Sequence, residues 1–173
     1  MRYVELEPAE VALKAFNYFP ELKCAESVFK AIIETLAEKV GEPYKSIPSY
    51  IMSYGKAGIY AWDGTCGAVN GACAAISTVL EGDDSKVKPL VDELLKFFLA
   101  EMQPAFAPYN VNPVRVSLPD LTCGGMVFRL IKLIKKEHAG LDDERRVVFC
   151  KSITYTAAYK AVELLNEFLK SQK

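Results

Sequence analysis

Apolar residues recur every three or four positions along much of the chain, which is the spacing of one buried face of an α-helix. Residues 7–18 have helical character, and a second helix is predicted from Pro20, which suits a first turn, to Gly41, which ends it. The apolar face of this second helix consists of Ala25, Val28, Phe29, Ile32, Ile33, Leu36 and Val40. Cys24 falls on its second turn, beside that face.

Two more helices are predicted in the middle of the chain. The first runs to Leu80 and can be capped by Asp63 or Thr65, because short polar side chains accept hydrogen bonds from the free N–H groups of a helix start. The second follows a turn at 81–85, and Pro89 fits only within its first turn. Its apolar stripe consists of Leu90, Val91, Leu94, Leu95, Phe98 and Leu99.

The C-terminal third predicts a further pair of helices. Thr122 can cap a helix over 123–137, and the segment 151–170 forms a final amphipathic helix. The inward positions of this last helix are Tyr155, Tyr159, Val162, Leu165 and Phe168. Residues 141–149 fit neither helix nor strand clearly.

The connections between these helices are long. Residues 43–58 are predicted as loop and short helix, and 104–119 carries four prolines and is expected to be extended. A short strand is predicted over 114–118, but one strand makes no sheet. The fold class is therefore mainly α: one domain over 1–173, a compact bundle of about five or six helices with long irregular connections.

Composition and charge exclude several classes of protein. The net charge of −1 lacks the basic excess of a nucleic-acid binder. No apolar stretch reaches the roughly 18 residues of a membrane span, and residues 1–7 lack the pattern of a signal peptide. The cysteine count of 5 is odd, so reduced thiols or a metal site in the cytoplasm are expected rather than a disulfide framework.

The segment Cys66-Gly67-Ala68-Val69-Asn70-Gly71 carries the clearest chemical signal. Cys66 opens a predicted helix, where free N–H groups and a partial positive charge are expected to lower the thiol pKa and favour a thiolate. Gly67 and Gly71 lie four residues apart near Ala68, so another backbone, subunit or cofactor can approach this face closely. The alternative is a cysteine in a tightly packed buried helix.

Three other cysteines lie near predicted helix starts. Cys123 begins one helix, Cys150 opens the last one, and Cys24 lies within two turns of another. Any one of them alone reads more readily as core, because free cysteine is among the most buried residue types. Cys73 is interpreted as a buried small residue rather than a ligand, and His138 as a surface residue at a helix end.

Several cofactor motifs are absent from the sequence. No two cysteines form Cys-x-x-Cys, which excludes the motifs of zinc ribbons, bacterial ferredoxins and thioredoxins. Without Cys-x-x-Cys-His there is no attachment motif for c-type haem, and neither a dinucleotide-binding nor a Walker glycine loop occurs. A metal site would have to gather ligands from separate helices.

The chain resembles the C_GCAxxG_C_C family of redox-active proteins. The resemblance rests on the Cys66–Gly71 motif and on the order of the cysteines around it, and it extends over about 19–168. Outside the motif, the segments similar to the family's split-Soret cytochrome c branch are 23–28, 47–48, 54–55, 62–65, Cys123, Cys150 and 161–166.

The resemblance implies a mainly helical homodimer in which Cys24, Cys66, Cys123 and Cys150 bind an iron–sulfur cluster. The split-Soret branch also carries c-type haem, but this chain lacks the attachment motif, so haem is not carried over. The implied role is electron transfer with a redox partner that the sequence does not identify.

Two rival hypotheses stay open. The first is a thiol–disulfide or peroxide-reactive protein in which Cys66 is the low-pKa attacking thiol and another cysteine resolves it. The second is a helical interaction module in which the cysteines are merely buried and the face of Gly67, Gly71 and Ala75 forms a dimer contact.

Overall fold

Six α-helices and two short 3₁₀ helices make up the fold, and the computed structural model describes residues 2–137 and 143–172. The elements are α1 (Pro8–Val40), η1 (Tyr44–Ser46), η2 (Ser49–Gly55), α2 (Ala57–Ala61), α3 (Gly67–Val79), α4 (Asp84–Ala100), α5 (Cys123–Glu137) and α6 (Asp143–Ser171). The described residues contain no strand, only two isolated bridges. The predicted mainly helical bundle is confirmed.

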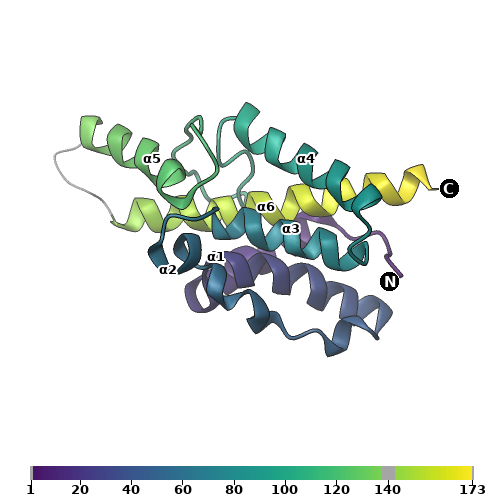
Figure 1. The fold of residues 1–173 in the computed structure, drawn as a ribbon. Coiled ribbons are helices and arrows are strands. Elements are labelled where there is room, and N and C mark those ends of the chain that lie inside the picture. The colour runs from purple at the N-terminus through teal and green to yellow at the C-terminus, as the bar shows by residue number, and fades with distance from the viewer. Residues whose placement is uncertain (1, 138–142, 173) are drawn as a thin grey trace.

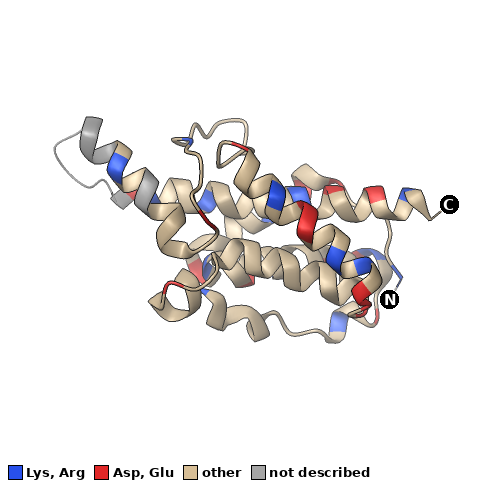
Figure 2. Cartoon of the chain, turned by 45° about the horizontal axis from the view of Figure 1, so that its top comes forward, with Lys and Arg blue, Asp and Glu red and all other residues tan. Residues whose placement is uncertain are grey.

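The two longest helices, α1 and α6, pack along each other, and α3 packs against both (Figure 1). Their facing sides are rich in alanine, which allows close approach, and larger side chains fill the spaces between them. Fully buried examples are Phe29 and Ile32 on α1, Ile76 on α3 and Ala157 on α6. α3 carries no charged residue, in keeping with its place inside the bundle (Figure 2).

α1 contains a break that the sequence did not locate. Lys23 has φ 63° and ψ −165°, a conformation that residues with a side chain rarely adopt, so the helix is interrupted between Pro20 and Cys24. The predicted boundary between two helices lies at 19–20, but the structure places it at Lys23. Cys24 therefore starts the second half of α1, where it had been expected on a second turn.

The last helix is longer than predicted. α6 begins at Asp143 and includes the described part of the segment that looked ambiguous, so the prediction of a start near Lys151 is wrong. Cys150 consequently lies inside α6 rather than at its start. His138 falls outside the described residues, as does the beginning of that ambiguous segment.

The proline-rich connection after α4 forms no strand. The prediction of a strand over 114–118 is wrong, because the segment finds only one bridge, between Val116 and Gln103. Instead, Phe106 from this connection stacks on Phe97 of α4, with ring centroids 5.9 Å apart. The same ring packs at a tilt against Tyr159 of α6, with ring centroids 4.4 Å apart. Among the described residues, no helix combines the length and the apolarity needed to cross a membrane.

Candidate metal centre

All four cysteines singled out in the sequence line one cavity of about 490 Å³. They come from four helices: Cys24 from α1, Cys66 from the start of α3, Cys123 from α5 and Cys150 from α6. Figure 1 shows α2, the start of α5 and the first turns of α6 at one end of the bundle, away from the C-terminus. Cys73 is half-buried and does not line this cavity.

A short backbone pairing brings two of these cysteines side by side. Thr65 and Thr122 form an antiparallel bridge just before α3 and α5. The Cys66 N–H donates to the carbonyl of Leu121 at 2.8 Å, and the Cys123 N–H donates to the carbonyl of Gly64 at 2.9 Å. The starts of two helices far apart in sequence therefore open into the same cavity.

The side chains before these helices cap α5 rather than α3. Asp63 was predicted to cap α3, but its Oδ1 accepts a hydrogen bond from the N–H of Gly124 at 2.5 Å. The hydroxyl of Thr122 accepts from the N–H of Gly125 at 2.9 Å, so Thr122 is the predicted cap of α5. No side chain caps α3, where the N-cap residue is Cys66 itself.

The small residues of the Cys66–Gly71 motif pack against α1. A Cβ atom on Gly67 would overlap the Sγ atom of Cys24, and one on Gly71 would overlap the carbonyl oxygen of Ala25. Ala68 is fully buried and lines the cavity, and the N–H of Asn70 donates to the carbonyl of Cys66. Close approach at this face is confirmed, but the face is internal and cannot be the dimer contact that one rival hypothesis required.

Burial raises the pKa of the Cys66, Cys123 and Cys150 thiols. The Cys66 pKa is well above its ordinary value, mainly through burial and then through the nearby Cys24, although the N–H groups of Val69 and Ala68 pull it down. Burial, with Cys24 and Cys123 adding to it, raises the pKa of Cys150 to about 12, and the Cys123 pKa is raised as well. The expected low-pKa thiol at Cys66 is therefore wrong for the metal-free chain, because desolvation outweighs the helix start.

Cations lie on the cavity wall beside the cysteines. Lys23, Lys56 and Arg146 all line it, and Arg146 acts to lower the pKa of Cys123 and Cys150. The Nζ of Lys56 lies 4.7 Å from the ring centroid of Tyr60, which also lines the cavity. No carboxylate is among the described lining residues.

The apolar part of the wall consists of Phe19, Met126, Val127, Val147, Phe149 and Ile153. Sequence reasoning missed the wall cations and Tyr60. The only signals were local: Lys23 precedes Cys24 directly, and Arg146 lies one helical turn before Cys150. Lys56 and Tyr60 gave no signal, because the fold alone brings their segment to the cavity.

The four thiols share the wall of one cavity. In the described part of the chain, no three His, Cys, Asp or Glu side chains converge closely enough to hold one metal ion. Four cysteine sulfurs around a common cavity nevertheless form a donor set that suits iron, because soft thiolates are the usual ligands of iron–sulfur clusters. The residues present therefore fit an iron-containing group held by cysteine thiolates.

Comparison with known proteins gives consistent relatives. The family described as "Putative redox-active protein (C_GCAxxG_C_C)" matches residues 22–164. The split-Soret cytochrome c of Desulfovibrio desulfuricans is 29% identical over an alignment of 168 residues, and the alignment covers 94% of this chain. This chain spans 59% of the length of that curated relative.

A solved structure shares the fold. It is described as "A novel iron centre in the split-Soret cytochrome c from Desulfovibrio desulfuricans ATCC 27774". The TM-score is 0.85 at 26% sequence identity, and the similarity covers 99% of this chain and 72% of the other.

Proposed function

This chain belongs to the redox-active C_GCAxxG_C_C family, and from that premise we propose that it is an electron-transfer protein whose four cysteines hold an iron–sulfur cluster. One observation carries the proposal: a single cavity is lined by Cys24, Cys66, Cys123 and Cys150. These cysteines lie far apart in the sequence. A shared metal group accounts for thiols from four helices lining one cavity, because metal ligands that are distant in the sequence come together only in the folded chain.

Cluster chemistry agrees with the donor set and with the relative. The proposed ligands are all cysteines, as in most iron–sulfur sites, and the related split-Soret cytochrome c contains an iron centre. The four thiols line one cavity, as the ligands of a shared cluster would. A cluster bound here would supply one-electron transfer over a potential range set by its surroundings.

The protein's own contribution is to stabilise thiolates in a buried place. The N–H groups of Ala68 and Val69 at the start of α3 point to the sulfur of Cys66 and favour its charged form. Arg146 favours the charged forms of Cys123 and Cys150. In the proposed cluster site these groups would also tune the potential, because hydrogen bonds and charges around the ligands change it.

The proposal includes no covalently attached haem, since the sequence has no Cys-x-x-Cys-His. It places the protein in the cytoplasm, where thiols stay reduced, and as a homodimer, as the family likeness implies. The oligomeric state is checked by light scattering coupled to gel filtration. A monomeric mass in both the metal-free and the iron-loaded chain would contradict the dimer.

The rival thiol–disulfide function needs a reactive thiolate. Burial raises the Cys66 pKa instead of lowering it, and the attacking thiol in such proteins depends on its thiolate fraction. The structure therefore offers no observation that favours this alternative.

Anaerobic reconstitution tests the cluster. The full chain is incubated with ferrous iron and sulfide, and bound iron, bound sulfide and the electron paramagnetic resonance spectrum are measured. Changing any one of the four lining cysteines to serine should lower the bound iron several-fold. Cys73→Ser is the matched control, because Cys73 is a half-buried cysteine outside the cavity and its loss should leave iron unchanged.

Two results would contradict the proposal. One is a full chain that binds no iron together with sulfide after reconstitution. The other is a Cys73→Ser variant that loses as much iron as the variants of the lining cysteines.

A further inference from the structure

Exposed apolar side chains are concentrated in one short stretch. Of the eleven large hydrophobic residues that are exposed in the described part of the chain, six lie between residues 50 and 62. We call them the aromatic rim: Tyr50, Ile51, Tyr54, Ile59, Tyr60 and Trp62. Trp62 is 87% exposed, and exposed aromatic side chains concentrated in one segment are typical of a protein-binding surface.

The backbone that carries half of this rim is strained. Ala57, Gly58, Ile59, Tyr60 and Ala61 all have φ between 50° and 69°, so α2 is a left-handed turn made almost entirely of residues with side chains. Such a conformation is unfavourable for L-residues, and most of all for a β-branched one such as Ile59. Strain of this kind persists only where the surrounding structure enforces it, and it is concentrated at functional sites.

The left-handed turn has one side packed against the cysteine site and one side exposed to solvent. On the inner side, the backbone of Gly58 lies so close to Cys123 that a Cβ there would be 2.6 Å from the Cβ of Cys123. On the outer side, Ile59, Tyr60 and Trp62 are exposed. Tyr60 also lines the cysteine cavity, so the aromatic rim and the cavity are continuous.

Three cations line the cavity wall together with the rim residue Tyr60. Lys23 and Arg146 are exposed cations on the cavity wall, and the Nζ of Lys56 lies over the ring of Tyr60. The carboxylate of Asp63, which follows Trp62 in the sequence, accepts a hydrogen bond from the N–H of Gly124. An apolar surface next to three cations matches a partner that carries acidic groups around an apolar centre.

We propose that the aromatic rim, together with Lys23, Lys56 and Arg146, is the docking surface for a small acidic electron-carrier protein. The electron-carrying role of this partner rests on the proposed function, because a carrier bound here would lie next to the four cysteines. The exposed aromatic rim and the three cations are features of the chain whether or not a cluster is bound.

A second copy of this chain fits the surface less well. In a two-fold symmetric dimer the patch meets a copy of itself, so the cations of both copies would be brought into one interface. Like charges opposed across an interface are unfavourable, whereas an acidic carrier places opposite charges there. The proposed homodimer therefore uses another face.

Binding of an acidic ferredoxin, used as the probe, tests the surface. Affinity for the immobilised full chain is measured by interferometry, in the metal-free and the iron-loaded form, from low to high salt. Trp62→Ala and Tyr60→Ala should each weaken binding about tenfold or more, because exposed aromatic anchors dominate such interfaces. Tyr109→Ala is the matched control, since Tyr109 is fully exposed away from the cavity, and it should change affinity less than twofold.

The charge requirement has its own pair of variants. Lys56→Glu should weaken binding about tenfold and reduce its salt dependence, while Lys45→Glu, an exposed lysine outside the cavity, should have little effect. Circular dichroism shows whether each variant is folded. Because the metal-free chain is measured as well, loss of the cluster and loss of docking are separate results.

Three outcomes would overturn the docking proposal. The first is equal affinity of the Trp62→Ala and Tyr109→Ala variants for the ferredoxin. The second is absence of binding to the acidic ferredoxin at low salt. The third is self-association of the full chain that Trp62→Ala abolishes, which would assign the surface to a second copy.

Discussion

Gly67, the first residue of α3, lies against the Sγ atom of Cys24 on α1, with no room for a side chain between them. The Cys24 thiol occupies the space that a side chain at position 67 would fill. The next glycine along the helix face, Gly71, gives the same closeness to the carbonyl of Ala25. The motif around Cys66 therefore positions a second cysteine as well as supplying the first.

Gly67→Ala should displace the thiol of Cys24. The added Cβ overlaps Sγ and the carbonyl oxygen of Gly55, so we expect a loss of stability of about 1 to 3 kcal/mol from overpacking. We also expect bound iron after reconstitution to fall several-fold. Iron analysis and urea unfolding measure the two effects.

Gly71→Ala separates these effects. Its Cβ overlaps the backbone of Ala25 but no sulfur, so stability should fall by a similar amount while the folded chain keeps its iron. A Gly67→Ala variant that is as destabilised as Gly71→Ala and still binds iron normally would show that the Gly67–Cys24 contact does not matter for the site.

Asp63→Asn should make Cys123 more reactive. The carboxylate of Asp63 raises the pKa of the Cys123 thiol, so removing its charge should lower that pKa and speed alkylation of Cys123 at a fixed pH. The asparagine oxygen can still accept from the N–H of Gly124, so the start of α5 should stay capped. Mass spectrometry of the labelled peptide over pH 7 to 10, a range of about three units around the ordinary thiol pKa, measures the rate. A slower or unchanged rate would contradict the assignment.

The metal-free chain should lose stability as the pH rises above about 8.5, the ordinary thiol value. Burial raises the pKa of Cys66 and raises that of Cys150 to about 12, so the folded chain keeps protons that the unfolded chain releases. The unfolded state therefore gains relative stability from about pH 8.5 up to the folded pKa. Below the thiol pKa of the unfolded chain, these two cysteines are protonated in both states, and the free energy of unfolding is not reduced by them. Tyr3 and Tyr18, whose pKa values are also raised, add to the loss only above about pH 10.

Urea unfolding of the metal-free chain from pH 7 to 9.5, a window of about two and a half units, measures this slope. Cys150→Ala should make the decline shallower because one raised pKa is removed. A free energy of unfolding that stays constant over this range would contradict the raised thiol pKa values.

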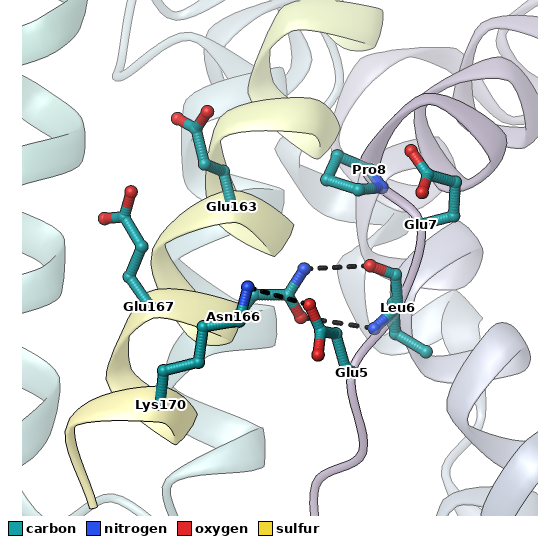
Figure 3. Close-up of a pocket in the computed structure, with 8 residues that line it drawn as sticks. All are labelled: Glu5, Leu6, Glu7, Pro8, Glu163, Asn166, Glu167 and Lys170. Carbon is teal, nitrogen blue, oxygen red and sulfur yellow. Dashed lines mark hydrogen bonds and ion pairs between the residues drawn. The ribbon is translucent and has the colours of Figure 1, made fainter.

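Asn166→Ala should detach the N-terminal segment from α6. The Asn166 side chain accepts from the Leu6 N–H at 3.2 Å and donates to the Leu6 carbonyl at 2.8 Å (Figure 3). It also accepts from the Tyr3 hydroxyl at 2.8 Å. Removing it leaves buried backbone groups unpaired, at a cost of about 2 to 3 kcal/mol in the free energy of unfolding.

Tyr3→Phe is the graded control for Asn166. It removes only the hydroxyl that donates to Asn166, so we expect a loss of about 1 kcal/mol. Equal losses for the two variants in chemical unfolding would show that the pairing with Leu6 contributes nothing. Iron content should be the same in both, because this contact is remote from the cysteine cavity.

The sequence by itself determined the helices and the candidate cysteines. Periodic apolar residues such as those from Val28 to Leu36 report a buried helix face through local geometry alone, so the class of the fold could be predicted. The small residues Gly67 and Gly71 likewise predicted that another backbone or group packs closely against this helix face. Each of these signals depends on spacing within one helix.

Only the tertiary structure decided which groups meet at the cavity. The break at Lys23, the place of Cys150 inside α6 and the pairing of Thr65 with Thr122 follow from contacts between distant segments. Burial then reversed the expected direction of the Cys66 pKa, because desolvation depends on everything packed around the thiol and not on the helix start alone. Spacing along a chain specifies one face of a helix, whereas a site between four helices exists only after they have packed.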